Sequence, residues 1–380
     1  MRIIADRLEL VGEYYFSKKL QEIEELGDPP VINLGMGNPD IPPPLGVSEA
    51  LSVAVNQPMN HGYQPYRSSI ELRKAIATWY KQNYAINLIP DSEILPIAGS
   101  KEGITQLSLA LLNPRDEVLV PDPGYLTYTS AAHLAGAVPK PYDLTEKKGW
   151  FPDFDKIVSS GVENVKMMWV NYPHMPTGAS GDKNVFQKLI EFGQEHNILI
   201  CHDNPYSFIS DTSKVSILSI NGAKETSVEL NSLSKSYNMA GWRVGMMVGR
   251  SDLIHAALQV KSNMDSGLFF PIQQAAIEAL KTPTSWIINL NNTYSKRRKI
   301  VYKVLDSLGC NYIEHQAGLF VWAKIPVKYK NGDEFSDWLL EKHHIFVTPG
   351  SVFGKNGEGY VRVSLCANQE TLHQVKERLA

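Results

Sequence analysis

The chain has 380 residues, 43% of them hydrophobic and 20% charged, with a formal net charge of -3 at pH 7. This composition is that of a globular protein long enough for two domains, and it excludes disordered and collagen-like chains. It gives no electrostatic reason to expect a nucleic-acid partner, because such binding needs clustered excess lysine and arginine. The one basic cluster, at residues 296–299, is predicted to lie on a solvated helix face.

The cysteines and the N-terminus place limits on cofactor type and location. Cys201, Cys310 and Cys366 are scattered and odd in number, so the sequence indicates neither a disulfide framework nor a thiolate metal site, and we expect no metal. The N-terminus is acidic and lacks the apolar core of a signal peptide, and the sequence contains no run of about 18 apolar residues. We therefore expect a cytoplasmic protein with no membrane partner.

Residues 1–40 are predicted to form an N-terminal arm and part of a small domain. A helix is expected over residues 10–25 and a short strand over residues 31–34, followed by a Gly-Met-Gly sequence that ends at Gly37. Two glycines so close together allow the backbone to approach a ligand. Gly37 is therefore a candidate substrate-binding residue.

Helices and short apolar strands alternate over residues 41–282, which predicts a large α/β domain with a mostly parallel sheet between helices. The predicted strands are 94–97, 117–120, 165–170, 198–201, 227–230 and 244–248, and the predicted helices are 69–83, 101–112, 182–196 and 252–264. Ligands of such sheets collect at the carboxyl ends of the strands. The residues just after each strand are thus the ones to examine.

The pattern changes at residues 283–380, where helices are grouped against a few strands. Strands are expected at 312–314, 318–324, 345–347 and 360–365, and helices at 284–308, at 334–343 and at the C-terminus. This grouping predicts a smaller α+β domain.

Two ligand-binding features follow the first two strands. Ser100 and Lys101 open a helix behind a glycine, where free N–H groups and the positive end of the helix dipole suit a phosphate, although an ordinary helix cap is an equal alternative. Tyr125 follows a proline turn after the second strand. Its ring offers a flat surface for a heterocycle, although packing is the commoner role of such a residue.

The next two strands end in polar residues. Asn171 and His174 lie in a proline-containing segment that packing alone explains poorly, and we expect both to point toward the ligand. Asp203 ends the following strand, with Tyr206 three residues later. A carboxylate there needs a cationic partner such as a protonated pyridine nitrogen, unless it caps a loop.

Lys235 lies in a Ser-Leu-Ser-Lys sequence after the fifth strand. Burial near another cation lowers a lysine pKa and allows the amine to form a Schiff base with an aldehyde. Arg243 would be that cation and would also offer a fork of donors to a phosphate. The pair favours pyridoxal phosphate as cofactor, although such a tetrapeptide alone is usually a surface loop.

In this order the motifs resemble those of the fold-type I, class I/II pyridoxal-phosphate aminotransferases of the aspartate aminotransferase superfamily, from about residue 33 to residue 364. The resemblance implies a seven-stranded sheet in the large domain. It implies that Lys235 is the catalytic lysine bound to the cofactor, that Arg243 binds the phosphate and that Asp203 pairs with the pyridine nitrogen. The other implied cofactor-binding residues are Ser100, Lys101, Tyr125, Asn171, Tyr206 and Ser232.

Further positions carry over from the resemblance. Tyr63 matches the tyrosine that reaches the phosphate in the neighbouring subunit, which implies a homodimer. Arg362 matches the arginine that holds the substrate α-carboxylate by a two-pronged ion pair. Met175 stands where the family usually has asparagine, so Arg362 is expected to lose a polar helper.

The resemblance implies an aminotransferase that moves an amino group from an L-amino acid to a 2-oxo acid, in an aspartate-like or diaminopimelate-like branch. Two alternatives remain. A lyase that breaks the C–S bond of a cysteine-type substrate would use the same cofactor residues. A non-enzymatic ligand-sensing domain of a transcription regulator would need a DNA-binding module, for which the roughly 30 residues before the shared region are too few.

Overall fold

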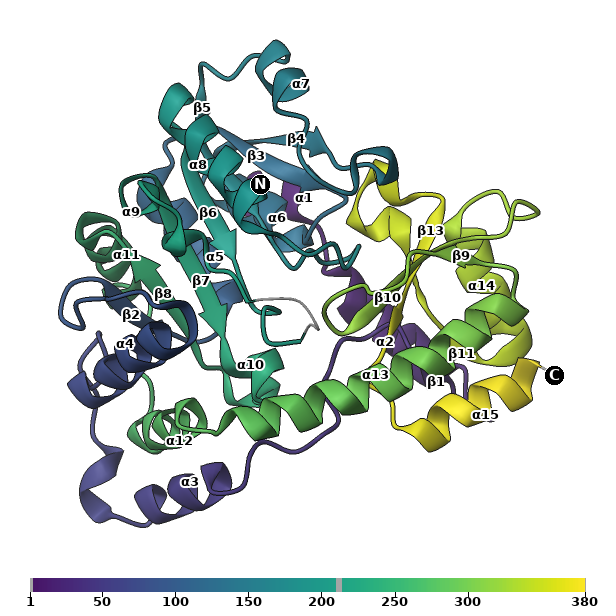
Figure 1. Cartoon of the computed structure of the whole chain (residues 1–380), viewed down its shortest axis with the longest axis horizontal. Helices are drawn as coiled ribbons and strands as arrows, with labels where there is room; N and C mark the ends of the chain where they lie inside the picture. The colour runs from purple at the N-terminus through teal and green to yellow at the C-terminus, as the bar shows by residue number, and fades with distance from the viewer. Residues whose placement is uncertain (1–2, 210–213, 380) are drawn as a thin grey trace.

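A seven-stranded sheet is the centre of the molecule, which a computed structural model describes over residues 3–209 and 214–379 (Figure 1). Its strands are β2 (Ile94–Ile97), β3 (Glu117–Asp122), β4 (Val138–Asp143), β5 (Val165–Val170), β6 (Leu199–Asp203), β7 (Ser227–Ser232) and β8 (Gly245–Gly249). They lie in the order β2-β8-β7-β6-β5-β3-β4, and only β8 runs antiparallel to its neighbours. The predicted mostly parallel sheet is confirmed.

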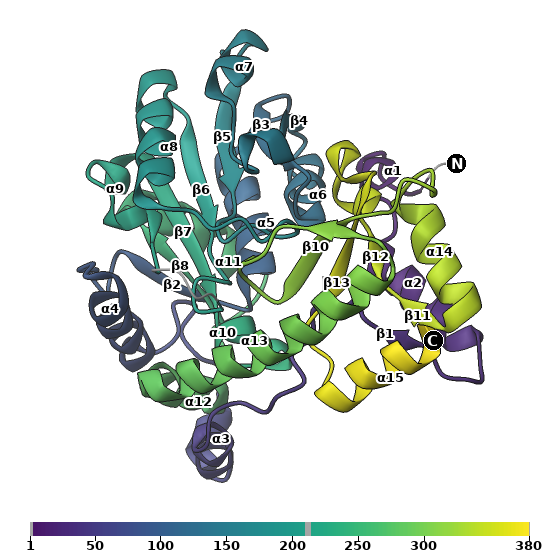
Figure 2. The ribbon, with the colours of Figure 1, turned by 45° about the vertical axis from the view of Figure 1, so that its right-hand side comes forward.

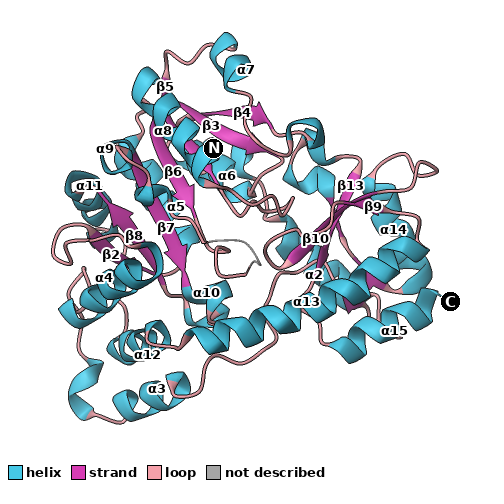
Figure 3. Cartoon of the chain, viewed as in Figure 1, coloured by secondary structure: helices cyan, strands magenta, loops and turns pink. Residues whose placement is uncertain are grey.

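Helices cover both faces of this sheet, so the residues of its central strands are buried on both sides. One face packs against α5 (Ser100–Leu111), α6 (Leu126–Leu134) and α11 (Ser251–Ser262). The other packs against α4 (Ile70–Tyr84), α8 (Lys183–His196) and α12 (Phe270–Leu280) (Figure 3). Short helices complete this part of the chain: α3 (Val47–Val55), α7 (Phe154–Ser159), α9 (Ala223–Thr226) and α10 (Leu233–Ser236).

A four-stranded antiparallel sheet, in the order β12-β13-β10-β9, forms a second layer with the C-terminal helices. The long helix α13 (Thr284–Ser307) runs from α12 to this sheet (Figure 2). The other elements are β9 (Asn311–Tyr312), β10 (Phe320–Lys324), α14 (Gly332–His343), β11 (Ile345–Phe346), β12 (Thr348–Pro349), β13 (Tyr360–Ser364) and α15 (Gln369–Leu379). The domain boundaries predicted after residues 40 and 282 stay predictions.

The N-terminal part differs from the expected single helix. It contains α1 (Arg7–Val11) and α2 (Tyr15–Glu25), and the break falls at Gly12, whose φ of 61° is a left-handed value that glycine adopts without strain. The following β1 (Ile32–Asn33) pairs in parallel with β11. The N-terminal and C-terminal parts of the chain therefore lie side by side.

Two strands, β4 and the two-residue β12, and several helices were not predicted. The sequence of β4 shows the reason for that strand. Its sequence Val-Pro-Lys-Pro-Tyr-Asp contains two prolines, which argue against a strand. β4 is the edge strand next to β3, where a residue without an N–H group is tolerated because one side of the strand has no partner.

The prediction that the basic cluster at 296–299 is solvated is wrong for its two arginines. Arg297 is buried and makes a bidentate ion pair with Asp40, at 2.6 and 2.7 Å. Arg298 is buried and donates to the Gly318 carbonyl oxygen at 2.9 Å. Both face the small sheet because they share a side of α13 with the buried Tyr294 and Val301.

Within the described residues, no helix has the length and apolar character needed to cross a membrane. The three cysteines are free thiols. No group of three or more metal-ligating side chains is found in the part of the chain that the structure describes.

Candidate active site

A cavity of about 300 Å³ lies at the carboxyl ends of the parallel strands, between the large sheet and the small one. It gathers residues from many parts of the chain because all the parallel strands end at the same edge. Every predicted cofactor-binding and substrate-binding residue except Tyr63 lines it. These residues are Gly37, Ser100, Lys101, Tyr125, Asn171, Asp203, Tyr206, Ser232, Lys235, Arg243 and Arg362.

Lys235 is held at the cavity by the short helix α10, which begins directly after β7. The Ser232 hydroxyl accepts from the Ser234 N–H at 3.1 Å and caps this helix. The lysine Nζ donates to the Gly37 carbonyl oxygen at 2.6 Å. Burial, and to a smaller degree the cations Arg362 and Arg243, lower the pKa of Lys235 to about 8. A useful fraction of its amine is therefore unprotonated near neutral pH.

Asp203 ends β6 and is 4% exposed. Its Oδ2 accepts from the Tyr128 hydroxyl at 2.9 Å, whereas Oδ1 is buried with no hydrogen-bond partner. Burial raises the pKa of this carboxyl to about 6. A buried oxygen without a donor is costly. The site therefore fits a ligand that brings a cationic N–H group, such as the protonated ring nitrogen of pyridoxal phosphate.

An anion cradle lies beside Asp203, where helix α5 begins at Ser100. Gly99, which precedes it, has a φ of 86°, and a Cβ there would collide with the Arg243 guanidinium. Arg243 is held by the carbonyl oxygens of Ala98 and Ala240, at 3.2 and 2.9 Å. A helix N-terminus and a guanidinium in one corner suit a phosphate.

Arg362 lies on β13 and is 4% exposed. Its Nη2 donates to the Gly35 carbonyl oxygen at 2.6 Å, and its guanidinium carbon lies 3.9 Å from the centroid of the Phe320 ring. Burial lowers the pKa of Arg362 to about 10, which leaves it charged at neutral pH. Nη1 lies 3.2 Å from the Met175 sulfur. The thioether thus contacts the arginine as a weak acceptor, where we had expected a missing helper.

Two residues with expected ligand contacts do not line the cavity. Tyr63 is 96% exposed on the surface, and its reach to a neighbouring subunit stays a prediction. The expectation that His174 points to the ligand is wrong. Its Nδ1 lies 2.8 Å from the Thr177 hydroxyl, and burial lowers its pKa to about 3.

Several lining residues were missed from the sequence. Tyr128 lies three residues after Tyr125, and this spacing on a helix was a usable signal that both face the same side. Four more lie within segments already singled out, near Gly37, Asp203, Lys235 or Arg243, although they were not themselves predicted: Met36, Pro205, Ser234 and Ala240. The others come from distant segments and carried no local signal. They are Tyr14, Phe16, Phe320 and Phe353.

Comparison with known proteins agrees with this geometry. Residues 29–379 match the family model described as aminotransferase class I and II. This chain belongs to that family. A curated LL-diaminopimelate aminotransferase of Aquifex aeolicus is 39% identical over 99% of this chain and 98% of its own. One from Halothermothrix orenii is 40% identical, over 99% of this chain and 97% of its own.

Solved structures give the same result for this aminotransferase. A substrate-bound BacF structure from Bacillus subtilis superposes with a TM-score of 0.96 at 37% identity, and covers 100% of this chain and 97% of its own. An aspartate aminotransferase mutant from Thermus thermophilus has a TM-score of 0.92 at 26% identity, and covers 100% of this chain and 99% of its own. The predicted fold-type I architecture is confirmed.

The family and its named relatives confirm the predicted activity class. The protein is a pyridoxal-phosphate-dependent aminotransferase of amino acid metabolism, in the aspartate-like and diaminopimelate-like branch. Amino acids and 2-oxo acids are its substrates. The relatives named are aminotransferases, so the non-enzymatic and C–S lyase alternatives receive no support from them.

Proposed function

We propose that Lys235 carries the Cα proton of an amino acid that Arg362 and the bound cofactor hold in the cavity. The observation that supports this role is the position of an amine with a pKa near 8 in the same cavity as a buried arginine and the orphan oxygen of Asp203. When bound, pyridoxal phosphate supplies an electron-withdrawing ring that stabilises negative charge at the substrate Cα. Lys235 can take the proton from the substrate Cα and return it to a carbon of the cofactor.

Different residues would hold the phosphate, the ring nitrogen, the ring face and the ring oxygen of the cofactor. Ser100, Lys101, Ser232 and Arg243 would hold the phosphate, and Asp203 would hold the ring nitrogen and keep it protonated. Tyr125 would stack on the ring, and Asn171 and Tyr206 would bond its oxygen. All of these side chains line the one cavity.

Arg362 would bind the substrate α-carboxylate and thereby fix the orientation of the Cα–H bond. Gly37 would lie against the substrate through its backbone, since its carbonyl oxygen is already within 2.6 Å of the Lys235 amine. A Cβ at position 37 would collide with the Phe320 ring. Glycine is therefore needed for the chain to pass this wall of the cavity.

We propose LL-diaminopimelate as the amino donor to test first, because curated relatives with this activity match 99% of the chain. A second candidate is a donor with an apolar side chain. The guanidinium of Arg362 is surrounded by the rings of Phe320, Phe353 and Phe16, at 3.9, 4.6 and 5.4 Å from their centroids. Such a wall favours apolar groups next to the carboxylate site.

We also propose a cytoplasmic homodimer in which Tyr63 completes the partner's phosphate site. The side chains of Leu45, Met59 and Tyr63 are almost fully exposed on the α3 side of the molecule. Large exposed apolar residues in one segment are typical of a protein interface. Tyr63 would then be close to a cofactor that its own chain does not bind.

The experiment is a half-reaction screen. Holoenzyme is mixed with single amino acids and the visible absorbance of the bound cofactor is followed. We expect loss of this absorbance with LL-diaminopimelate, or with aromatic and aliphatic amino acids if the apolar wall dominates. Release of pyruvate and thiol from a cysteine-type donor without consumption of a 2-oxo acid would show a lyase. Full turnover by Lys235→Ala protein would refute the proposed role of the lysine.

A further inference from the structure

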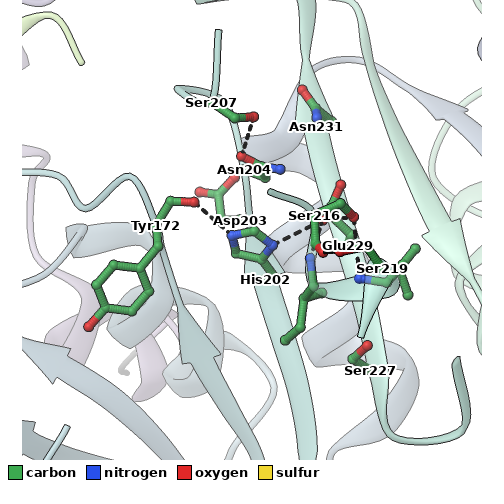
Figure 4. A network of polar contacts seen from close by, with 12 residues as sticks. Tyr172, His202, Asp203, Asn204, Ser207, Ser216, Ser219, Ser227, Glu229 and Asn231 are labelled. Carbon is green, nitrogen blue, oxygen red and sulfur yellow. Dashed lines mark hydrogen bonds and ion pairs between the residues drawn. The ribbon is translucent and has the colours of Figure 1, made fainter. Parts of the chain in front are cut away.

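A buried acid lies in the middle of the central strand β7, behind the cavity. Glu229 is 0% exposed and stands directly opposite His202 in the register of β6 and β7. His202 is also 0% exposed, and its Nδ1 lies 3.0 Å from Glu229 Oε2 (Figure 4). A buried acid is expensive unless it is fully hydrogen-bonded. The groups that hydrogen-bond to Glu229 therefore determine whether its carboxyl is ionised.

The groups around Glu229 can all donate to a carboxylate. Its Oε2 accepts from the Ser216 hydroxyl at 2.6 Å and from the Ile217 N–H at 3.2 Å. The Tyr80 hydroxyl, from α4, donates to Oε1 at 2.8 Å. The Ile217 N–H can only donate, and an ionised carboxylate can accept from it and from both hydroxyl groups at once. These contacts fit an ionised Glu229.

The acceptors around His202 require an imidazolium. Its Nε2 lies 2.9 Å from the Tyr172 carbonyl oxygen, which can only accept, so this nitrogen carries a proton. Its Nδ1 faces the Glu229 oxygen that already accepts from Ser216 and Ile217. Next to an ionised Glu229, this nitrogen donates as well. The ring then has two protons and one positive charge, and it forms a buried ion pair with Glu229.

The pair is connected to the cavity by two short paths. His202 is the residue before Asp203 on β6, and it holds the carbonyl of Tyr172, the residue after Asn171. The Asn171 amide in turn donates to the Asp203 carbonyl oxygen at 2.7 Å and accepts from the Met175 N–H at 2.7 Å. Two hydrogen bonds therefore join the ends of β5 and β6 next to Asp203, one from His202 to Tyr172 and one from Asn171 to Asp203.

We propose that His202 and Glu229 form an imidazolium–carboxylate pair that acts as a positioning device, holding Asp203 and Asn171 in the orientation the cofactor ring needs. This inference rests on the proposed cofactor contacts of Asp203 and Asn171. The pair touches neither cofactor nor substrate, because neither residue lines the cavity. The two residues of the pair have opposite electrostatic effects on Asp203. His202 lowers the pKa of that carboxyl, and Glu229 raises it.

The charge state is tested on the native protein by NMR of protein labelled with 15N-histidine. We expect both ring nitrogens of His202 to carry protons at pH 7, with and without cofactor. The signal is assigned by its absence in His202→Gln protein and by its shift in Glu229→Gln protein. A neutral ring with one protonated nitrogen in the native protein would overturn the proposal, and this result does not depend on cofactor binding or activity.

The positioning role is tested by cofactor affinity and by the visible circular dichroism of the bound cofactor, which reports ring orientation. Glu229→Gln should bind pyridoxal phosphate about tenfold more weakly, the loss of one charged hydrogen bond, and should change the circular dichroism. Tyr80→Phe removes only the donor to Oε1 and should give a smaller change of the same sign. It replaces Glu229→Gln if that variant does not fold.

The matched control is Ser227→Ala, two residues before Glu229 on β7. The Ser227 hydroxyl is buried and donates to the Ala223 carbonyl oxygen at 2.7 Å. This variant should lose thermal stability and keep the native affinity and circular dichroism. Glu229→Gln or Tyr80→Phe protein that behaves like this control would show a purely structural role. Native protein that binds no cofactor would instead refute the proposed function.

Discussion

The sulfur of Met175 lies 3.2 Å from Nη1 of Arg362, and both side chains are buried at the cavity wall. The thioether accepts weakly and cannot donate, so it can help to orient the guanidinium but cannot bond a bound carboxylate. In the proposed function the arginine would therefore be the main carboxylate ligand. We expect substrate binding to be sensitive to both residues.

Replacing Met175 with leucine keeps the volume and removes the sulfur contact. We expect the KM for the amino donor to rise by about three- to tenfold with little change in kcat, because a buried N–H loses its acceptor. Met175→Asn should lower KM, since an amide can donate to the carboxylate. Steady-state kinetics of both variants test this, and an unchanged KM in Met175→Leu would contradict it.

Arg362→Lys keeps the positive charge and loses the planar fork. We expect kcat/KM to fall by roughly 100-fold or more, because one bidentate contact and the stacking on Phe320 are lost together. The matched control is Arg297→Lys, which breaks the bidentate pair of a buried arginine with the partly exposed Asp40. Neither residue lines the cavity. That variant should unfold at a lower temperature with a nearly native KM. Equal KM changes in both variants would argue against a carboxylate site at Arg362.

Asp203→Asn should raise the stability of the cofactor-free protein and weaken its binding of the cofactor. The pKa of Asp203 is raised to about 6, so the folded cofactor-free protein binds more protons than the unfolded chain between about pH 4 and 6. Its stability falls as the pH rises through this window, and the cost remains above pH 6. Asn should remove this cost of up to roughly 3 kcal/mol at pH 7, and should weaken cofactor binding about 100-fold. Denaturant unfolding at several pH values, together with cofactor titration, measures both effects.

Lys235→Met should abolish turnover and stabilise the cofactor-free protein at neutral pH. The pKa of Lys235 is lowered to about 8, below its ordinary value of about 10.5. The unfolded chain therefore binds more protons between these values, and stability rises with pH across that window. The advantage of the variant should be full below pH 8 and disappear near pH 10.5. The exposed Lys299→Met is the control, and an equal gain there would point to net charge as the cause.

The proposed dimer is tested by light scattering after gel filtration. Leu45→Asp combined with Met59→Asp places charges on the exposed apolar surface and should give monomers that bind cofactor poorly. Tyr63→Phe should stay dimeric and bind the cofactor about tenfold more weakly, the loss of one hydrogen bond to a charged phosphate. A monomeric native protein with full activity would contradict the shared site.

Much of the site was predictable because its parts follow buried strands. Ser100, Asp203 and Lys235 stand directly at or after strands whose apolar runs are clear in the sequence, and parallel strands bring such positions to one edge. The glycine at position 99 and the hydroxyl groups around Lys235 added local signals. These features need no knowledge of long-range packing.

Other parts depend on tertiary contacts that leave no local pattern. Phe16 and Phe353 reach the cavity from segments far apart in the chain. Arg297 is buried where α13 packs against the small domain, and its partners Asp40 and Leu365 come from distant segments. Glu229 alternates with the apolar Val228 and Leu230, as a polar residue on an ordinary strand would, so the sequence did not mark it as buried. Its partner His202 could be assigned only from the register of β6 and β7.

The cavity wall joins Phe16, near the beginning of the polypeptide, to Arg362, near its end. During synthesis the ribosome must release nearly the whole chain before these two residues can meet, because contacts between distant segments form after local ones. The last strand of the large sheet ends at Gly249, so a growing chain would contain the proposed cofactor-binding residues well before the proposed carboxylate ligand Arg362. In the proposed function, newly made protein would therefore be able to bind the cofactor before it can hold a substrate.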